Sequence, residues 1–244
     1  MSVSDPKASR RGTLAVVTGG SRGIGAEVIR VFAAGGYDIA TYSRNEASLQ
    51  ELGEEIITKY GVQFHHRVAD AAVRGEVNAF GDLVQSLGKP VGVLVNNAGN
   101  FVPGAVLEEP ETAFGDQVSV NLESAYRITR KLAPAMKAAR SGHIFNMCSV
   151  ASIKAYPAGG TYAITKTALL GFSRNLREEL RDFGVRVTTV MPGATYTESW
   201  AGAGLPEERF IPVEDLARLM WACHDLSPRT CVEELLLRPQ LGDI

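Results

Sequence analysis

Three residues near the middle of the chain have the types and spacing needed for proton transfer. Tyr162 and Lys166 are four positions apart at the start of a predicted helix, so both side chains project from one face. A phenol has a pKa of about 10, and a nearby ammonium stabilises the phenolate. We therefore expect the pair to lend and recover a proton nearer neutrality than tyrosine alone. Ser149 ends an apolar run from His143 that predicts a strand, so its hydroxyl is expected to face a site at the strand's carboxyl end.

The Tyr-x-x-x-Lys spacing alone is a weak signal. An amphipathic helix can carry it by accident, with a half-buried Tyr and a Lys stem lying across it. Of the seven tyrosines, however, only Tyr162 has a Lys four residues later, and Ser149 lies thirteen residues upstream across one strand-to-helix connection. A glycine-rich turn near the start of the chain completes the pattern.

That turn follows a short apolar run, Leu14–Thr18, which is typical of a parallel strand covered on both faces. The helical pattern Ala26–Ala34 comes directly after it. A glycine turn between strand and helix lets the backbone bend sharply and approach a pyrophosphate at the positive end of the helix. The sequence therefore predicts a dinucleotide site at Gly19, Gly23 and Gly25.

The second predicted strand, Asp38–Ser43, indicates which dinucleotide binds. An Asp or Glu at its end would accept from a ribose 2′-hydroxyl and repel a 2′-phosphate. Here Ser43 is followed by Arg44, and Arg22 in the glycine turn offers a second guanidinium. Two such groups suit a phosphate better than a diol, which favours NADP(H) over NAD(H). The alternative for Arg44 is an exposed loop cation.

Later segments leave alternatives open. Asp70 follows the third strand, where it accepts from an adenine amino group or caps the next helix. Asn96–Gly99 ends the fourth strand and forms either a plain turn or a border of the cofactor cleft. Asn121 lies within the helical stretch Glu111–Arg140, facing solvent or holding a specific hydrogen bond. Residues 198–212 form either a mobile loop over the site or a surface excursion.

Two sets of apolar residues complete the picture. We expect the helix after Gly160 to bury a stripe at i+4 spacing: Ile164, Ala168, Phe172, Leu176 and Leu180. We expect a partly apolar substrate pocket lined by loop residues beside Ser149 together with Phe101, Trp200, Leu205 and Phe210.

Length and composition bound the remaining possibilities. The 244 residues fit one α/β domain, residues 1–244, with a polar N-terminal extension, 1–11, that has no leader-like apolar core. A net charge of −2 gives no long-range attraction to nucleic acid or anionic membrane, so small molecules are the expected partners. Neither the three cysteines nor the four histidines have metal-ligand spacing, and we expect no metal and a cytoplasmic location. Cys148 is expected to be a buried thiol.

With these motifs assembled, the chain resembles the short-chain dehydrogenase/reductase family in its classical branch. The resemblance runs from about Thr13 to Leu237 and includes Thr18-Gly-x-x-x-Gly-x-Gly25, Asn96-Asn-Ala-Gly99 and Tyr162-x-x-x-Lys166. It implies a Rossmann-like doubly wound sheet of seven parallel strands in the order 3-2-1-4-5-6-7 with helices on both faces. It also implies a homotetramer or homodimer. The ending Leu237–Ile244 departs from the family's frequent Asp-Gly-Gly, and Cys148 stands where many members have Ser.

The resemblance also assigns roles. It implies a catalytic tetrad of Asn121, Ser149, Tyr162 and Lys166, with Asn121 anchoring a water and Thr197 binding the nicotinamide carboxamide. The residues expected to contact the cofactor are Gly19, Ser21, Arg22, Gly23, Ile24, Gly25, Ser43, Arg44, Asp70, Asn97, Ala98, Gly99, Tyr162, Lys166, Pro192, Gly193, Thr195 and Thr197.

The expected reaction is hydride transfer between NADP(H) and a carbonyl or secondary alcohol, with a ketone or 3-oxoacyl compound as substrate. The alternatives are an NAD-linked alcohol dehydrogenase or epimerase on the same scaffold, and a nucleotide-sensing protein without catalysis. Sensing proteins of this kind usually lose the Tyr or the Lys, and both are present here. A hydrolase using Ser149 is disfavoured because no Gly-x-Ser-x-Gly sequence surrounds that residue.

Overall fold

A single parallel sheet forms the centre of the described structure. The computed structural model describes residues 10–200, 202 and 204–244, and within them seven strands pair in the order β3-β2-β1-β4-β5-β6-β7. Every pairing is parallel, so the predicted topology is confirmed. The strands are β1 (Leu14–Thr18), β2 (Asp38–Ser43), β3 (Phe64–Val68), β4 (Val91–Asn96), β5 (Gly142–Met147), β6 (Val185–Pro192) and β7 (Glu234–Leu237). Strand order reverses between β1 and β4, where open sheets of this type form a ligand crevice.

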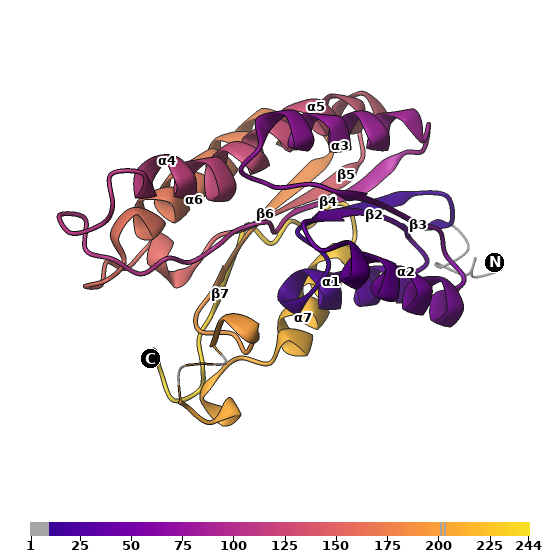
Figure 1. The fold of residues 1–244 in the computed structure, drawn as a ribbon. Helices are drawn as coiled ribbons and strands as arrows, with labels where there is room; N and C mark the ends of the chain where they lie inside the picture. The colour runs from indigo at the N-terminus through magenta and orange to yellow at the C-terminus, as the bar shows by residue number, and fades with distance from the viewer. Residues whose placement is uncertain (1–9, 201, 203) are drawn as a thin grey trace.

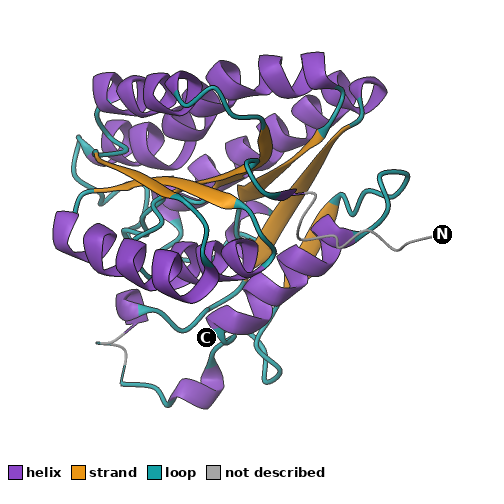
Figure 2. Ribbon diagram, turned by 90° about the vertical axis from the view of Figure 1, so that its right-hand side faces the viewer, coloured by secondary structure: helices purple, strands orange, loops and turns teal. Residues whose placement is uncertain are grey.

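Helices cover both faces of the sheet. Figure 1 shows α3, α4, α5 and α6 above it and α1, α2 and α7 below, and Figure 2 shows both layers from the side. The helices are α1 (Gly23–Ala34), α2 (Glu46–Tyr60), α3 (Arg74–Ser86), α4 (Ala113–Val118), α5 (Ser124–Ala139), α6 (Gly160–Leu180) and α7 (Val213–Asp225). None of the helices in the described part of the chain is both long and apolar enough to cross a bilayer.

The strands have continuous apolar runs because helices pack against both faces of the sheet. Side chains alternate along a strand, so every position of β1 needs an apolar partner on one side or the other. Ala15 and Val17 pack in the layer of α1 and α7, whereas Leu14 and Val16 pack with α3, α5 and the end of α6. All four are fully buried, which holds the carboxyl end of β1 rigidly at the crevice.

Two expectations about these elements were wrong. Strand β5 ends at Met147, so Ser149 lies two residues beyond it and not within it. Helix α6 does not bury the predicted stripe from its start, because Ile164 and Ala168 are exposed. Its first turns bury Thr165 and Lys166 instead, since the inner face there lines the site rather than the apolar core.

Candidate active site

The glycine turn adopts a backbone that only glycine accommodates easily. Gly19 and Gly23 have positive φ angles of 66° and 55°. A Cβ on Gly25 would lie 2.5 Å from the Gly19 carbonyl oxygen. The turn leads directly into α1, whose first turn has neither a side-chain cap nor an acidic residue. Its backbone N–H groups and the helix dipole thus suit an anionic ligand, and these residues fit the pyrophosphate of a dinucleotide.

The Asn-Asn-Ala-Gly segment after β4 clamps this turn. The Asn97 side chain donates to the carbonyl oxygens of Thr18 and Gly19 at 3.0 and 3.1 Å. In return, Thr18 Oγ1 accepts from the backbone N–H groups of Asn97 and Ala98, each at 2.9 Å. The segment is therefore more than a plain turn, because it joins the ends of β1 and β4 and also borders the crevice.

One cavity of about 1100 Å³ brings the predicted site residues together. Ser149, Tyr162 and Lys166 line it at one end, and the glycine turn, Ser43, Arg44 and Asp70 line it at the other. Every residue predicted to contact the cofactor lies on its wall. Of the predicted tetrad only Asn121 does not line the cavity.

Asn121 lies behind the cavity wall and does not line the cavity itself. It is fully buried in a π-helical segment, Ser119–Glu123, between α4 and α5. Its Oδ1 accepts from the Asn100 backbone N–H at 2.8 Å, and its Nδ2 donates to the Asn100 carbonyl oxygen at 3.1 Å and to Thr165 Oγ1 at 3.2 Å. Asn121 therefore holds specific hydrogen bonds, and through them it fixes the loop after β4 against α6.

Lys166 is buried and points at the end of β5. Its Nζ donates to the Met147 carbonyl oxygen at 2.7 Å and lies 5.7 Å from the centre of the Tyr162 ring. A Cβ on Gly99 would lie 3.3 Å from the same nitrogen, so a larger residue there would crowd it. The amine is thus fixed between the ends of β4 and β5, on the same wall as the phenol.

Tyr162 and Ser149 are held by different local contacts. The Tyr162 ring meets Phe101 edge to face, with ring centres 4.9 Å apart. Ser149 caps the short helix Val150–Ser152, and its Oγ accepts from the Ala151 N–H at 3.1 Å. Because Oγ is the acceptor in that bond, the hydroxyl proton remains available to a ligand in the cavity.

Burial dominates the protonation of this site. It raises the pKa of Tyr162 to about 12, and the Ser149 hydroxyl offsets only part of that rise. Burial also lowers the pKa of the Lys166 ammonium and raises that of the Cys148 thiol to about 11. Burial thus moves the pKa of the phenol away from neutrality in this structure, opposite to the direction predicted from the nearby Lys166. The prediction that Cys148 is a buried thiol is confirmed.

The adenosine end carries the polar groups expected there. Ser21 and Ser43 share a hydrogen bond of 2.7 Å between their hydroxyls. Arg44 is exposed on the cavity wall and has no ion pair within the described residues. Arg22 pairs with Glu198, so its guanidinium reaches across to the segment after β6. Asp70 Oδ1 accepts from the Ala72 N–H at 2.8 Å, so Asp70 stabilises the turn before α3 while it lines the cavity.

The predicted apolar pocket is only half right. Phe101 and Trp200 line the cavity, but Leu205 and Phe210 do not. Phe210 is buried and packs against Trp200 with ring centres 5.3 Å apart, so it supports the wall from behind. Val150, Lys154 and Tyr156 line the cavity, as expected for loop residues beside Ser149. Asn100, Asp243 and Ile244 also line it, and the sequence did not single them out.

With this geometry established, comparison with known proteins decides the family. The sequence profile of the short chain dehydrogenase family matches residues 13–207. The chain belongs to this family. It is therefore an oxidoreductase that acts on the alcohol and carbonyl couple.

Individual relatives agree with this assignment to the short chain dehydrogenases. The chain is 36% identical over 182 residues to the very-long-chain 3-oxoacyl-CoA reductase of Laccaria bicolor, a match that covers 73% of this chain but only 54% of that relative. It is 30% identical to the sepiapterin reductase of Chlorobaculum tepidum over 94% of this chain and 97% of the relative. The solved alcohol dehydrogenase of Thermococcus sibiricus, complexed with 5-hydroxy-NADP, superposes with a TM-score of 0.87 at 28% identity, covering 95% and 98% of the two chains.

Proposed function

We propose that this short chain dehydrogenase is an NADP(H)-dependent reductase of ketones, with 3-oxoacyl-type compounds as the best-supported substrate class. The observation that carries the proposal is the shared cavity: Ser149, Tyr162 and Lys166 line the same cavity as the glycine turn. A cavity of about 1100 Å³ accommodates a dinucleotide and a small substrate together. The name of the Laccaria relative supports the substrate class.

Each site residue has a task that its geometry allows. Ser149 donates its hydroxyl proton to the substrate oxygen, because the bond that Oγ accepts from the Ala151 N–H leaves that proton unused. Tyr162 supplies the proton that the oxygen takes up on reduction, and its raised pKa keeps the phenol protonated for this purpose. Lys166, fixed on the Met147 carbonyl, retains further N–H donors for the nicotinamide ribose. Asn121 positions these groups without touching the substrate.

The dinucleotide, when bound, supplies the hydride that reduces the carbonyl carbon. The groups that would hold it are the N-terminal N–H groups of α1, the Ser43 hydroxyl, and Thr195 and Thr197 beyond β6. Arg44 supports NADP(H) over NAD(H), because an exposed guanidinium without an ion pair in the described structure suits a 2′-phosphate. An NAD-linked dehydrogenase is the alternative that a cofactor titration would distinguish.

We extend the proposal to assembly and location. Phe114, Tyr126 and Ile164 expose apolar surface on α4, α5 and α6, which supports a homodimer or homotetramer. Sedimentation velocity would give the mass of a monomer if this were wrong. The three cysteines are all free thiols, which supports a reducing, cytoplasmic setting.

The direct test is an activity screen. The purified protein is mixed with NADPH or NADH and a panel of ketones, 3-oxo esters and aldehydes, and turnover is followed at the nicotinamide absorbance. We expect NADPH oxidation with at least one ketone class and a higher kcat/KM with NADPH than with NADH. Tight NADPH binding without turnover of any carbonyl compound would favour the nucleotide-sensing alternative.

A further inference from the structure

The chain after β7 turns back to the substrate end of the cavity. The Gly193 N–H donates to the Leu237 carbonyl oxygen at 2.8 Å, and a Cβ on Gly193 would lie 3.1 Å from Pro239 Cδ. The Gly242 N–H then donates to the Pro239 carbonyl oxygen at 2.9 Å and closes a turn. This turn places Asp243 and Ile244 on the cavity wall, beside the segment that follows β6.

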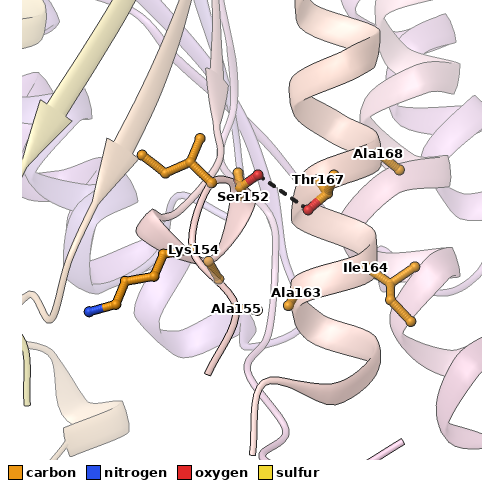
Figure 3. Close-up of a pocket in the computed structure, with 9 residues that line it drawn as sticks. Ser152, Lys154, Ala155, Ala163, Ile164, Thr167 and Ala168 are labelled. Atoms are coloured by element: carbon orange, nitrogen blue, oxygen red, sulfur yellow. Dashed lines mark hydrogen bonds between the residues drawn. The ribbon is translucent and has the colours of Figure 1, made fainter. Parts of the chain in front are cut away.

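Asp243 joins this turn to the segment after Ser149. Its carboxylate accepts from Arg238 within the turn and from Lys154 Nζ at 3.0 Å. Lys154 lies only five residues after Ser149 in the chain. Lys154 lines both the main cavity and the shallow groove beside Thr167 and Ala168, and Figure 3 shows its side chain pointing away from α6. The side chain is more than half exposed and shares the wall of the main cavity with Ser149 and Tyr162.

The charges along the cavity show what this contact does. Arg44 and Asp70 lie at the adenosine end, and Lys166 belongs to the catalytic group. The other charged side chains on the wall form two ion pairs, Arg22 with Glu198 and Lys154 with Asp243. The same cavity wall also includes Tyr156, Trp200 and Ile244. Among the described residues of the wall, the cation beyond the catalytic group at this end is Lys154, and Asp243 engages it.

We propose that Asp243 is a specificity-determining residue that selects uncharged carbonyl substrates by occupying Lys154. A substrate carboxylate entering this end would approach the Asp243 carboxylate and would have to displace it from Lys154. An uncharged ester or thioester meets no such opposition. The inference rests on the proposed reductase function and adds the charge of the preferred substrate to it.

The test compares a 3-oxo carboxylic acid with its ethyl ester, using NADPH as reductant. The parent protein should prefer the ester. Asp243→Asn keeps the shape of the side chain but frees Lys154. Because Lys154 is more than half exposed, the substitution should raise the acid-to-ester ratio of kcat/KM about two- to fivefold. NADPH affinity, measured by fluorescence titration, should stay unchanged because the substitution is at the substrate end.

Two matched variants separate charge from loosening of the turn. Asp243→Asn combined with Lys154→Met should return the ratio to its parent value, because no cation remains to attract the acid. Arg238→Gln leaves the Lys154–Asp243 pair intact and should not change the ratio. The inference would be overturned, with the proposed function left intact, by either of two results. One is an unchanged acid-to-ester ratio in active Asp243→Asn protein. The other is a raised ratio that persists in the double variant. Absence of NADPH oxidation by the parent with every carbonyl compound would contradict the proposed function as well.

Discussion

The side-chain amide of Asn121 forms a pair of hydrogen bonds with the backbone of Asn100, accepting from its N–H at 2.8 Å and donating to its carbonyl oxygen at 3.1 Å. Asn100 lines the cavity, whereas Asn121 is completely buried. The Asn121 side chain thus supplies hydrogen-bond partners for the backbone N–H and carbonyl of Asn100, which lies in a loop and has no partner in a strand. The π-helical turn at Ser119–Glu123 is the local backbone irregularity that accompanies this arrangement.

Replacing Asn121 should therefore reduce both stability and turnover. Asn121→Leu leaves the Asn100 N–H and carbonyl without partners, and we expect a loss of about 1–3 kcal/mol in the free energy of unfolding. We also expect kcat to fall, since the loop beside Lys166 loses its support. Urea unfolding and steady-state kinetics measure both effects. Among the described residues, the exposed Asn175 amide bonds only within α6, so Asn175→Ala should be nearly neutral. Equal losses in both variants would contradict the role of Asn121.

Arg44→Asp should shift the cofactor preference. A carboxylate at this position repels a 2′-phosphate and accepts from a ribose diol. Because hydrogen bonds to a charged group contribute about 1.5–3 kcal/mol, we expect KM for NADPH to rise roughly 10- to 100-fold while KM for NADH falls. The exposed Arg218, which pairs with Asp215 on α7, provides the control Arg218→Asp. Unchanged ratios of kcat/KM for the two cofactors in Arg44→Asp would contradict the phosphate assignment.

The raised pKa of Tyr162 predicts opposite pH profiles for ketone reduction and for alcohol oxidation. Reduction needs the protonated phenol, and a pKa of about 12 keeps it protonated through the neutral and mildly alkaline range. Hence deprotonation of Tyr162 should not lower kcat/KM for ketone reduction between pH 7 and about pH 10. Oxidation of the alcohol needs the phenolate and should become faster as the pH rises over the same range. A reduction profile that falls with a midpoint between about pH 7 and 9 would show that Lys166 outweighs burial.

Two buried histidines predict that the fold weakens in acid. Burial, with Arg186 adding to it, lowers the pKa of His143 well below its ordinary value and that of His224 to about 3. The unfolded chain takes up protons near pH 6.5 that the folded chain does not. Stability is therefore highest above pH 6.5 and falls below it, by about 1.4 kcal/mol per pH unit for each histidine, until the folded-state pKa is reached.

Urea unfolding between pH 8 and pH 4.5 measures this slope. His224→Phe keeps a ring in the cluster with Phe32 and Trp221 and should remove about half of the slope, although it leaves the Tyr37 hydroxyl without its 2.7 Å partner. Loss of that bond lowers the stability of the variant at pH 8 as well, so the diagnostic quantity is the change in the free energy of unfolding per pH unit. A parent protein equally stable at pH 7 and pH 5 would contradict the prediction.

The sequence predicted the fold and most of the cavity because their signals are local. The buried apolar runs of β1 (14–17) and β4 (93–95) can be seen in the sequence, and the glycines at 19, 23 and 25 are required by backbone geometry. These patterns can be recognised without knowing the tertiary contacts. Strand order followed from the family resemblance and not from the runs themselves.

The features that the sequence could not supply depend on distant contacts. The buried face of α6 begins with Thr165 and Lys166 because that face lines a cavity, which no apolar periodicity reveals. Burial in the folded site, where the Tyr162 ring contacts Phe101, raises the pKa of Tyr162, and a lysine four residues away in the sequence does not reveal that burial. Lys154 and Asp243 are 89 residues apart in the chain, and only the turn after β7 brings them together.

The central claim is that the Tyr162 phenol transfers the proton, and Tyr162→Phe tests it most directly. The substitution removes one oxygen and keeps the ring against Phe101. Tyr156→Phe removes a second phenol from the same cavity and serves as the matched control. We predict that kcat for ketone reduction falls at least 100-fold in Tyr162→Phe, with NADPH binding retained, and stays near the parent value in Tyr156→Phe. Near-parent turnover in Tyr162→Phe would contradict the account.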